Sequence, residues 1–548
     1  MVEVDAKVDT EKIEEQLYKI KLGDNNYDEQ LKKAEDFKSE GNNYVKENKL
    51  VLAIDSFTKA IDMKVETSKN AIYLANRAHI HIKMENFGLA LADANKAIEI
   101  DGDYIKAYYR RASALLNMRK YEEALKDLLF LQAKYPDNDD IKIKVNNTRS
   151  ERKRQKFYES IQSDREEASN DDLFLKQFKN YKVESTYNNQ VYQSENAIKN
   201  SEELSKEEKE NYNTNKFNKS SGSGFRLSLS SPSFNSKIDE AWVVKLMNEM
   251  KDSKFIHKKY LTQMLYDAKT IFEQEKALVD ITVEDDIEIS VCGDTHGQYY
   301  DLLNIFKVNG YPSKTNPYLF NGDFVDRGSF SVEVVISLIA WKLLYPNHFF
   351  LSRGNHESKN LNKMYGFEGE VRSKYDDQIY ELFSSLFCTL PLCHVINKKI
   401  FVVHGGLFSK DGVTLDDLRA IDRIREPAES GLMCECLWAD PCKEMGRMPS
   451  KRGVGLSFGP DVTKKFLDSN GLSMIVRSHE VKQEGYEVDH DGRLVTVFSA
   501  PNYCDQMGNK GALIRFKGKD MLPNYVQYTH VEHPKVPPMR FANPWMMF

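Results

Sequence analysis

Between about residues 30 and 152, apolar residues and alanines recur at helical spacing, which predicts amphipathic helices that pack through one face. Related runs begin at Ala53, Ala90 and Ala124; the second and third begin 34 residues apart, and the first and second 37. The extra residues of the longer interval fall in the turn at Lys64–Lys69. Because three such runs stay in phase, we expect three stacked helix pairs rather than unrelated helical hairpins.

A 34-residue period with small residues where helices cross closely is typical of tetratricopeptide repeats. Pro136 stands where that pattern expects a closing proline. A basic amphipathic helix from about Val145 to Ile161, reaching about residue 165, should extend the stack. From about residue 165 to 236, Asn, Ser, Glu and Lys dominate with little periodic apolar content, which predicts a mostly disordered linker.

The pattern changes again from about residue 238 to 540. An amphipathic helical pair, around Trp242–Met250 and Tyr260–Phe272, precedes several short apolar strands. Each strand ends abruptly in polar residues: Gly293-Asp294-Thr295-His296-Gly297, Asn321-Gly322-Asp323-Phe324-Val325-Asp326-Arg327-Gly328, Arg353-Gly354-Asn355-His356-Glu357, His404-Gly405-Gly406, Arg477-Ser478-His479-Glu480 and Ser499-Ala500-Pro501-Asn502-Tyr503. Because α/β proteins bind ligands where strand ends converge, we expect these ends to meet on one edge of a sheet.

Six of these side chains form a set of metal-type ligands, with three oxygen donors and three imidazoles: Asp294, His296, Asp323, Asn355, His404 and His479. Such a set suits two octahedral or near-octahedral divalent cations, such as Mn²⁺, Fe²⁺ or Zn²⁺, better than a closed structural zinc site. The carboxylate of Asp323 is the best candidate to bridge them. Two metals about 3.5–4 Å apart clamp the attacking and leaving oxygens of an in-line displacement. The set therefore predicts metal-assisted hydrolysis.

Neighbouring residues complete a site for a phosphate ester. Guanidinium groups match phosphoryl oxygens bidentately, and we expect Arg327 and Arg452 to bind the phosphate. Arg353 has two equal alternatives, the phosphate or a structural ion pair. His356 follows a ligand asparagine, and its natural role is the general acid that protonates the leaving alkoxide. Asp326 is the best candidate to orient that imidazole and raise its pKa.

Together with Ser-Ala-Pro-Asn-Tyr-Cys, these motifs resemble those of the PPP-family serine/threonine protein phosphatases, within the wider calcineurin-like metallophosphoesterases. The stretch Tyr365-Gly-Phe-Glu-Gly-Glu-Val and the tail from His533 are similar to the members that carry N-terminal tetratricopeptide repeats. The resemblance implies a multidomain chain. An all-α repeat domain (30–152) and a linker (165–236) would precede an α/β catalytic domain (238–540), a β-sandwich flanked by helices, and a tail (541–548).

The resemblance also implies roles for individual residues. Asp294, His296 and Asp323 would hold one metal ion, and Asp323, Asn355, His404 and His479 the other. Mn²⁺ is the first expectation for the two ions, with Fe, Zn or Mg as alternatives. His356 with Asp326 would be the acid pair. The phosphate would touch Arg327, Asn355, Arg452 and Tyr503, and the substrates would be phosphoserine and phosphothreonine in proteins.

The repeat region carries a second candidate site. Lys38 and Asn42 are spaced i,i+4 on one helix, and Lys106 and Arg110 are spaced i,i+4 on a later one, so each pair shares a helical face. Asn76 and Lys83 can join them from the helix between. Any one pair alone is more often an ordinary solvated helix face.

The arrangement resembles the carboxylate clamp of tetratricopeptide co-chaperones, which implies the acidic Met-Glu-Glu-Val-Asp tail of Hsp90 as the partner. At Lys83 the related phosphatase carries an arginine, so the charge is kept but a guanidinium fork is lost.

The resemblance further implies autoinhibition, in which the repeat domain holds activity low until the clamp is filled. Glu85 matches the acidic residue expected to approach Arg327 in that state. The segment Phe541–Phe548 would brace the interface, although Asn543-Pro544 stands where relatives have a longer apolar helix.

Composition narrows the functional classes. The chain has 548 residues, and its 77 Lys+Arg against 83 Asp+Glu give a net charge of -6, unlike a strongly basic nucleic-acid-binding protein. The N-terminus lacks an apolar signal-peptide core, and the richest apolar run, Val334–Tyr345, is too short to span a bilayer. With its 7 sparse cysteines, the chain fits a reducing compartment, so we expect a cytoplasmic and also nuclear protein. A monomer is the default expectation for the oligomeric state. The trio Cys434, Cys436 and Cys442 lacks a fourth zinc ligand.

One alternative of a different class stays open. A repeat scaffold could carry a metal domain that is inactive or that cleaves another ester, such as a dinucleotide polyphosphate. The presence of all the metal-type ligands, the phosphate arginines and His356 favours the phosphatase.

Overall fold

The computed structural model describes residues 24–64, 68–162 and 238–542. Contacts divide the chain into two compact units: one holds the N-terminal helices together with Pro449–Val454, and the other holds the rest of the described C-terminal residues. The predicted linker (165–236) lies outside the described residues, as does the tail from residue 543.

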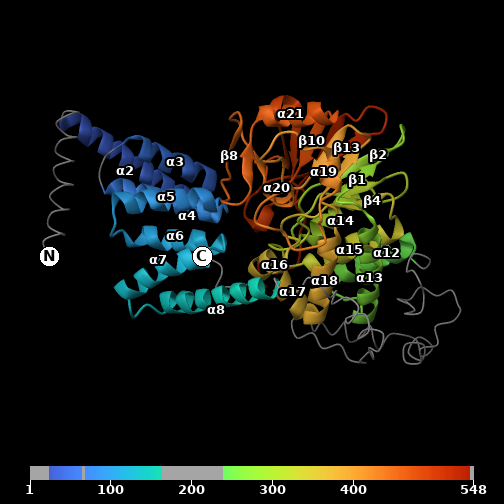
Figure 1. Ribbon diagram of the computed structural model, residues 1–548, viewed down its shortest axis with the longest axis horizontal. Helices are drawn as coiled ribbons and strands as arrows, with labels where there is room; N and C mark the ends of the chain where they lie inside the picture. Colours follow the sequence, from blue (N-terminus) through green and yellow to red (C-terminus); the bar gives the residue numbers. More distant parts are fainter. Residues whose placement is uncertain (1–23, 65–67, 163–237, 543–548) are drawn as a thin grey trace. The chain divides into compact units, whose positions relative to one another are not determined.

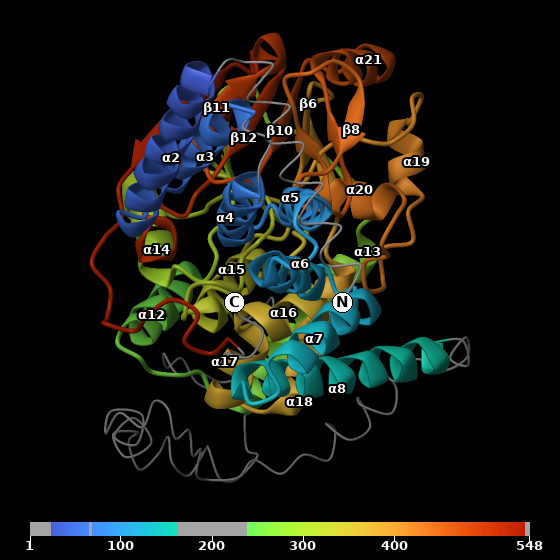
Figure 2. The same ribbon diagram turned by 90° about the vertical axis from the view of Figure 1, so that its left-hand side faces the viewer.

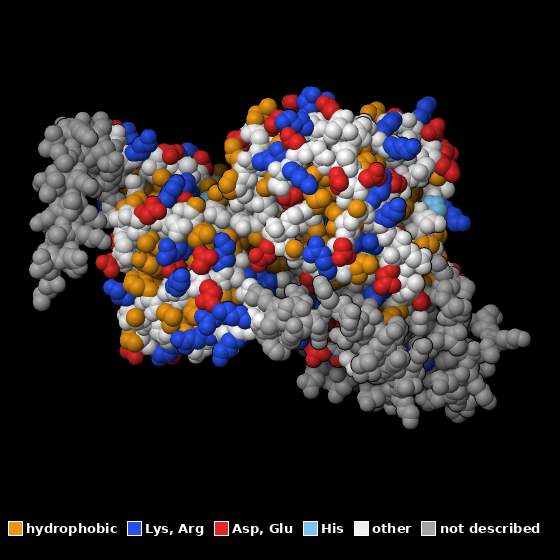
Figure 3. Space-filling view, viewed as in Figure 1, with side chains coloured by type: hydrophobic (Ala, Val, Ile, Leu, Met, Phe, Trp, Pro, Cys, Tyr) orange, Lys and Arg blue, Asp and Glu red, His pale blue; other side chains and the backbone are white. Residues whose placement is uncertain are grey.

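The N-terminal unit is a stack of helices in which each packs against the next (Figures 1 and 2). The helices are α2 (Asp24–Lys46), α3 (Leu50–Asp62), α4 (Lys69–Lys83), α5 (Phe87–Ile100), α6 (Ile105–Asn117), α7 (Tyr121–Lys134) and α8 (Asp139–Gln162). The pairs α2/α3, α4/α5 and α6/α7 confirm the predicted repeats. Helix α8 begins at Asp139, ahead of the predicted start, because Asn138 caps Ile141 N–H at 3.1 Å and two aspartates in the first turn favour a helix N-terminus. Figure 3 shows Lys and Arg side chains gathered over α8.

Small residues let the repeat helices approach one another, as the pattern predicted. Ala53, Ala90 and Ala124 have no exposed surface. A Cβ added at Gly41 would lie 2.9 Å from the ring of Phe57, so the crossing of α2 and α3 requires glycine there. Larger side chains at these positions would separate the helices and lose the packing of one pair.

A ladder of partly buried ion pairs repeats with the same period. Arg77 donates to both carboxylate oxygens of Asp93 at 2.8 Å, and Arg111, 34 residues later, does the same to Asp127 at 2.8 and 2.7 Å. In the first repeat a hydrogen bond of 3.1 Å from Ser56 to Glu40 occupies the corresponding place. Because both partners are hydrogen-bonded in bidentate geometry, burial of these charges is compensated.

The turn within each repeat uses a left-handed residue. Asn48, Glu85 and Arg119 occupy equivalent positions and have φ of 56°, 61° and 61°. Asparagine adopts this conformation readily, whereas it costs other residues with a Cβ roughly 1–2 kcal/mol. The acidic side chain of Glu85 is therefore kept at a position where its backbone is strained.

The C-terminal unit contains two large sheets. One has the order β1 (Leu278–Ile281), β5 (Cys393–Ile396), β6 (Ile400–Val403), β10 (Met474–Arg477), β12 (Leu494–Val497), β11 (Tyr486–Asp489). The other has the order β14 (Pro523–Tyr528), β13 (Gly511–Lys517), β2 (Glu288–Cys292), β3 (Tyr318–Phe320), β4 (Phe349–Leu351). A small third sheet joins β7 (Asp440–Pro441), β9 (Leu456–Phe458) and β8 (Arg447–Pro449).

The two large sheets pack face to face around a buried aliphatic core that includes Val291, Leu319, Val402, Val476 and Val497. Helices cover both outer faces (Figure 1). They are α12 (Glu240–Lys251), α13 (Lys258–Gln274), α14 (Tyr299–Asn309), α15 (Ser331–Leu344), α16 (Lys359–Tyr365), α17 (Phe367–Lys374), α18 (Asp377–Thr389), α19 (Leu415–Arg419), α20 (Leu432–Trp438) and α21 (Pro460–Asn470). The predicted β-sandwich flanked by helices is confirmed. Within the described part of the chain, every helix is too short or too polar to cross a bilayer.

From the sequence we expected the polar strand ends to meet at one edge of a single sheet. The structure instead divides these strands between the two large sheets. Strands β2, β3 and β4 are parallel neighbours in one sheet, and β6, β10 and β12 are parallel neighbours in the other. Parallel strands have their carboxyl ends at the same edge of a sheet, but this rule does not determine whether the strands belong to one sheet or to two. The expectation of a single sheet was therefore wrong. An isolated bridge between Asp294 and Phe498 joins the two edges. The polar residues therefore lie where the edges of two packed sheets meet.

Candidate functional site

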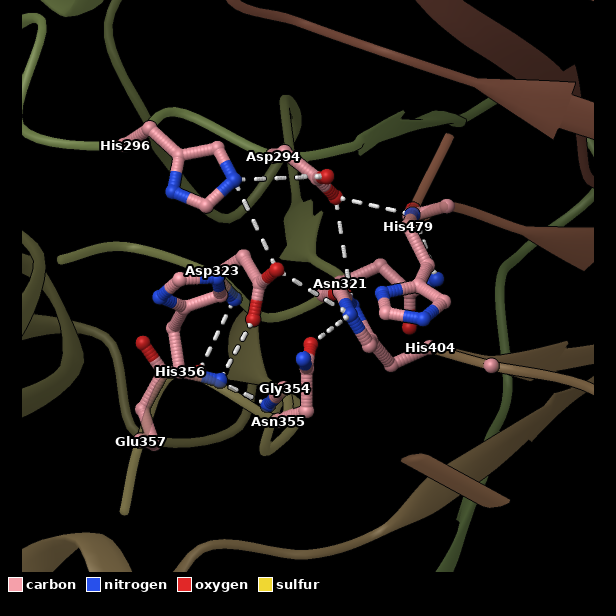
Figure 4. Close-up of polar contacts among 12 residues, drawn as sticks. Asp294, His296, Asn321, Asp323, Gly354, Asn355, His356, Glu357, His404 and His479 are labelled. Atoms are coloured by element: carbon pink, nitrogen blue, oxygen red, sulfur yellow. Dashed lines mark hydrogen bonds and ion pairs between the residues drawn. The ribbon is translucent and has the colours of Figure 1, made fainter. Parts of the chain in front are cut away.

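The six predicted metal ligands come together at the meeting edges of the two sheets (Figure 4). Asp294 and His296 follow β2, Asp323 follows β3, and Asn355 follows β4. His404 and His479 follow β6 and β10 of the other sheet. All six side chains are buried.

The loops that carry these ligands are tight. His296, Asp323 and His479 have φ of 41°, 52° and 67°, a region that residues with a Cβ rarely adopt. A Cβ added at Gly354 would lie 2.2 Å from Asp323 Oδ1, so only glycine lets the β4 loop approach that carboxylate. Strained backbone concentrated in one place is typical of functional sites.

The carboxylate of Asp323 lies between two groups of imidazoles. Its Oδ2 is 3.5 Å from His296 Nε2 and 3.3 Å from His404 Nε2. Among the described residues, two groups have the geometry to hold a metal ion: Asp323 with His296 and His356, and Asp323 with His404 and His479. Asp323 belongs to both, which is the position of a bridging ligand.

Asp294 also lies at this centre. Its Oδ2 is 3.7 Å from His296 Nε2, and its Oδ1 accepts a hydrogen bond of 3.1 Å from the His479 N–H. The first geometric group contains His356 in addition to the predicted His296 and Asp323, so a histidine that we had assigned to acid catalysis also borders the metal position.

Hydrogen bonds from the outside orient the imidazoles. His296 Nδ1 is 3.0 Å from the Val325 carbonyl, and His404 Nδ1 is 2.8 Å from the Asn321 carbonyl. A carbonyl oxygen can only accept a hydrogen bond, so these contacts assign the N–H to Nδ1 and leave Nε2 with its lone pair toward Asp323. Asn321 was missed in the sequence: its amide donates to Val403 O at 2.8 Å and Ser478 Oγ at 2.9 Å, which ties the end of β3 to the opposite sheet.

The charges of the site fit divalent cations. Burial raises the pKa of Asp294 to about 7, and the adjacent Asp323 carboxylate adds to the rise. Burial also lowers the pKa of His296 well below its ordinary value and lowers that of His404. One terminal atom of the Asn355 amide faces the centre and lies 3.0–3.1 Å from side-chain atoms of Asp323, His404 and His479. When this atom is Oδ1, it and the neighbouring carboxylate and imidazole acceptors all point toward the same place. A cation stabilises such a convergence.

His356 and Asp326 form the predicted pair. His356 Nδ1 is 2.8 Å from Asp326 Oδ2, and both residues are buried. Burial raises the pKa of Asp326 to about 7, while hydrogen bonds from Phe367 N–H and the Asn362 amide oppose the rise. Asn362, which was missed in the sequence, also donates to the His356 carbonyl at 2.6 Å. The imidazole is therefore fixed in both position and tautomer.

Glu357 was also missed, although it ends the Arg-Gly-Asn-His-Glu motif. Its Oε1 accepts from Phe324 N–H at 2.8 Å, and its Oε2 accepts from Asp323 N–H at 2.9 Å and Gly354 N–H at 2.7 Å. One carboxylate thereby holds the β3 and β4 loops together.

The predicted phosphate arginines have different surroundings. Arg327 is buried, and its guanidinium carbon lies 3.6 Å from the centre of the Tyr365 ring. Arg353 donates to the backbone carbonyls of Glu357 at 3.0 Å and Arg425 at 2.7 Å. We had considered a phosphate contact or a structural ion pair for Arg353. The structure instead shows a structural role in which Arg353 links loops through their backbone carbonyls. Arg452 lies in the segment grouped with the N-terminal unit, and its role stays a prediction.

Tyr503, the other predicted phosphate contact, borders the metal centre. Its ring centroid is 5.1 Å from that of His296. Its neighbours Asn502 and Cys504 have φ of 43° and 53°, so this loop is also strained. The buried thiols of Cys434 and Cys436 belong to neither of the two metal-type groups found among the described residues, and burial raises the pKa of Cys434 to about 12.

The predicted clamp residues lie on the first helix of each pair, namely α2 (Lys38, Asn42), α4 (Asn76, Lys83) and α6 (Lys106, Arg110). Tyr73 of α4 donates to Glu35 of α2 at 2.7 Å, so these two helices are adjacent. Burial, Arg110 and Lys83 together lower the pKa of His79 to about 4, so the cations of α4 and α6 act on one point. The closeness of the remaining members stays a prediction.

Comparisons with known proteins agree with this architecture. A family described as calcineurin-like phosphoesterases matches residues 287–483, tetratricopeptide repeats match 71–104 and 105–129, and a region described as the PPP5 TPR repeat region matches 192–280. Human serine/threonine-protein phosphatase 5 is 46% identical over 513 residues, 94% of each chain. The chain belongs to the serine/threonine-protein phosphatase 5 family.

Further relatives of the phosphatase 5 family support the assignment. Serine/threonine-protein phosphatase 5 of Solanum lycopersicum is 62% identical over 302 residues, 55% of this chain and 54% of that one. A solved phosphatase from Saccharomyces cerevisiae, described as similar to human phosphatase PP5, is 44% identical with a TM-score of 0.54 and covers 56% of this chain and all of that one. As a member of the family, the chain is a serine/threonine protein phosphatase with tetratricopeptide repeats and two groups of metal-type ligands.

Proposed function

We propose that the chain hydrolyses phosphoserine and phosphothreonine in proteins at a dinuclear metal site, and that its repeat domain docks an acidic chaperone tail and restrains catalysis. The observation that carries the proposal is the Asp323 carboxylate, 3.5 and 3.3 Å from imidazoles on two different sheets, beside the His356–Asp326 pair.

The position of Asp323 in both groups supports the following assignment of the metal ligands. Asp294, His296 and Asp323 would hold one ion, and Asp323, Asn355, His404 and His479 the other. Mn²⁺ is our first assignment, with Fe, Zn or Mg as alternatives, because oxygen and imidazole donors suit all of them. When bound, the two cations supply Lewis acidity, which polarises the phosphoryl group and lowers the pKa of the attacking water.

His356 would deliver the proton that the leaving serine or threonine oxygen needs. Its Nδ1 is committed to Asp326, so Nε2 is the nitrogen from which a proton can be transferred. The Asp326 carboxylate favours the imidazolium form and is held by Asn362 and Phe367 N–H. The pair thus resembles the orienting carboxylate and histidine of other acid–base sites.

Arg327, Asn355, Arg452 and Tyr503 would hold the phosphoryl oxygens. Arg327 is suited to this role because its guanidinium is already stacked on Tyr365, so less side-chain entropy is lost on binding. Tyr503 lies beside His296, with ring centroids 5.1 Å apart, and it belongs to a loop whose left-handed residues Asn502 and Cys504 fix its position.

The decisive experiment is hydrolysis of a phosphoserine peptide with Mn²⁺ by the wild type and by His356→Asn. We expect kcat to fall by about 10²–10⁴-fold, the usual contribution of a general acid, with metal content unchanged. His348→Asn, at a histidine outside the site, is the matched control and should retain the wild-type rate. An unchanged kcat in His356→Asn would remove the acid assignment, and hydrolysis of a dinucleotide polyphosphate in place of the peptide would favour the alternative activity.

The second part of the proposal concerns the clamp. Lys38, Asn42, Asn76, Lys83, Lys106 and Arg110 would bind the terminal carboxylate and acidic side chains of an Hsp90-type tail. The support is their placement on α2, α4 and α6 and the combined effect of Lys83 and Arg110 on His79. Clustered cations raise affinity for a multiply acidic peptide through charge-assisted hydrogen bonds.

Titration with the peptide Met-Glu-Glu-Val-Asp tests the clamp. Lys106→Ala should weaken binding by about ten- to 150-fold, because a charge-assisted hydrogen bond contributes about 1.5–3 kcal/mol. Lys126→Ala, an exposed lysine on α7, is the control and should bind like the wild type. Equal affinity of the Lys106 variant, or equal binding of a C-terminally amidated peptide, would contradict the carboxylate clamp.

A further inference from the structure

The last described residues, Val531–Ala542, lie beyond the final strand and have no regular secondary structure, yet they lie against the active-site turn. Met539 N–H donates to the Arg327 carbonyl at 2.7 Å. Two residues further along that turn, Ser329 Oγ donates to the Pro537 carbonyl at 2.8 Å. We call Val531–Ala542 the strap.

The strap also contacts the guanidinium of Arg327. Met539 Sδ accepts from Arg327 Nη1 at 3.7 Å, while the Tyr365 ring lies 3.6 Å from the guanidinium carbon. Met539 packs in one apolar cluster with Leu361, Met364 and Tyr365. The arginine is therefore contacted by the aromatic ring and by the thioether, and its backbone carbonyl accepts from the same methionine.

Several anchors hold the strap against the catalytic unit. Near its start, Val531 N–H donates to Asp301 at 3.0 Å, and His533 pairs with Asp505 at 3.0 Å. Near its end, a Cβ at Gly369 would lie 2.3 Å from the Phe541 carbonyl, so helix α17 requires glycine to admit the strap. Because Met539 lies between these anchors, it is held in a defined place.

The backbone on both sides of the contact is strained. Arg327 has φ of 70° and Met539 has φ of 56°. Such conformations cost of order 1–3 kcal/mol and persist where surrounding contacts determine them. The hydrogen bond between these two residues links both strained positions, so each stabilises the other.

We propose that the strap is a working part of the phosphate site and that Met539 is a positioning residue, which holds the Arg327 guanidinium ready for the phosphoryl group. The inference rests on the proposed role of Arg327. An arginine that is ordered before substrate arrives loses less side-chain entropy on binding. The strap precedes the segment Phe541–Phe548 that the sequence suggested as a brace, and shares only Phe541 and Ala542 with it.

The test uses the full chain, a phosphoserine peptide as substrate and inorganic phosphate as the inhibitor that reports on the arginine. Met539→Ala should raise both KM and the inhibition constant of phosphate by about five- to tenfold, with Mn²⁺ affinity unchanged. Met539→Leu refills the apolar cluster and should recover most of the loss. Lys535→Ala, an exposed strap residue, is the control and should match the wild type.

A double-mutant cycle separates positioning from general loss of structure. Arg327→Ala alone should weaken phosphate inhibition, and adding Met539→Ala should then have no further effect. If Arg327→Ala weakens phosphate inhibition and Met539→Ala does not, the strap inference is overturned and the role of Arg327 stands. Additive effects of the two changes on phosphate inhibition would have the same consequence. If Arg327→Ala leaves phosphate inhibition unchanged, the proposed role of Arg327 is wrong and the inference is overturned with it.

Discussion

Glu357 shows how a single side chain outside the ligand set supports the metal centre. Its two oxygens accept three backbone N–H groups, from Asp323, Phe324 and Gly354, all at 2.7–2.9 Å. These donors belong to two loops that each carry a ligand. A carboxylate is the side chain that can accept from all of them, because an amide of the same shape replaces one acceptor by a donor.

We therefore predict that Glu357→Gln is strongly destabilising. The amide NH₂ would face either one or two backbone N–H groups, each unpaired buried group costing about 1–3 kcal/mol. Urea unfolding should show a loss of roughly 2–4 kcal/mol, and Mn²⁺ affinity should fall because Asp323 and Asn355 are no longer held in register. Glu368→Gln, another buried glutamate in the same unit, is the control. Equal stability of both variants would contradict the role given to Glu357.

Short motifs explain which residues could be predicted. Each ligand stands within a few positions of a strand end, so strand direction and chemistry sufficed to find Asp294, His404 and His479. Tyr365 and Met539 could not be assigned to Arg327, because Met539 is 212 residues away along the chain and its contact depends on tertiary packing. Arg353 was left open because an arginine beside a ligand has the same sequence pattern whether it binds phosphate or backbone carbonyls.

Helix α15, which begins directly after the Arg327 turn, depends on a buried charge cluster. Glu370 of α17 accepts from the N–H groups of Ser331 and Val332 at 3.1 and 2.8 Å, where it caps the helix. Lys374 donates to Glu370 at 2.7 Å, to Glu333 at 2.7 and 2.8 Å and to the Ser329 carbonyl at 3.3 Å. The fully buried ammonium group of Lys374 thus neutralises the carboxylates of Glu333 and Glu370, and through Glu370 it supports the start of α15.

Replacing Lys374 by methionine should lower the free energy of unfolding by about 3–5 kcal/mol, because it leaves buried carboxylates without their counter-ion. Burial already raises the pKa of Glu333, and loss of the lysine would raise it further. Adding Glu333→Gln removes one of the charges and should restore part of the stability. Denaturant unfolding measures both effects, with the exposed Lys307→Met as control. A Lys374 variant as stable as the control would contradict this account.

Helix α4 makes the repeat unit sensitive to acid. Burial is the main cause that lowers the pKa of His79 and His81 to about 4, from an ordinary value of 6.5. Arg110 and Lys83 face His79; Arg77 adds to the lowering at His81, and Asp93, 3.8 Å away, opposes it. The folded state therefore binds fewer protons than the unfolded state between these two values.

Acid should therefore destabilise the repeat unit. The stability contributed by the neutral histidines is fully present above pH 6.5 and is lost as the pH falls toward about 4. Each histidine should contribute on the order of 1–3 kcal/mol over that range. Hydrogen exchange of the α4 amides, corrected for intrinsic rates, should show this loss in the wild type and less of it in His79→Gln and His81→Gln. The same slope in all three proteins would exclude α4 as its origin.

At the scale of the whole chain, repetition made the N-terminal unit the more predictable part. The 34-residue period gave the helix pairs and the buried alanines, and applying the same period to the charged residues would also have found the Arg77–Asp93 and Arg111–Asp127 ladder. The division of the catalytic strands between two sheets had no such local signal, because strand pairing across 100 or more residues depends on the packing of both faces. Periodic sequence predicts local packing, whereas long-range pairing is decided by the assembled core.

The last prediction concerns regulation by the repeat unit. If Glu85 restrains the phosphate site, its acidic side chain is kept despite a backbone φ of 61° that asparagine would adopt at lower cost. Glu85→Asn should then raise the basal phosphatase rate several-fold while leaving the repeat unit equally or more stable. Removing residues 1–165 should raise the rate at least as much, and the peptide Met-Glu-Glu-Val-Asp should stimulate the wild type more than either variant. An unchanged phosphatase rate in Glu85→Asn would mean that Glu85 does not restrain the phosphate site. An unchanged rate after removal of residues 1–165 would exclude autoinhibition in this chain, because the domain proposed to cause it would have been removed without effect.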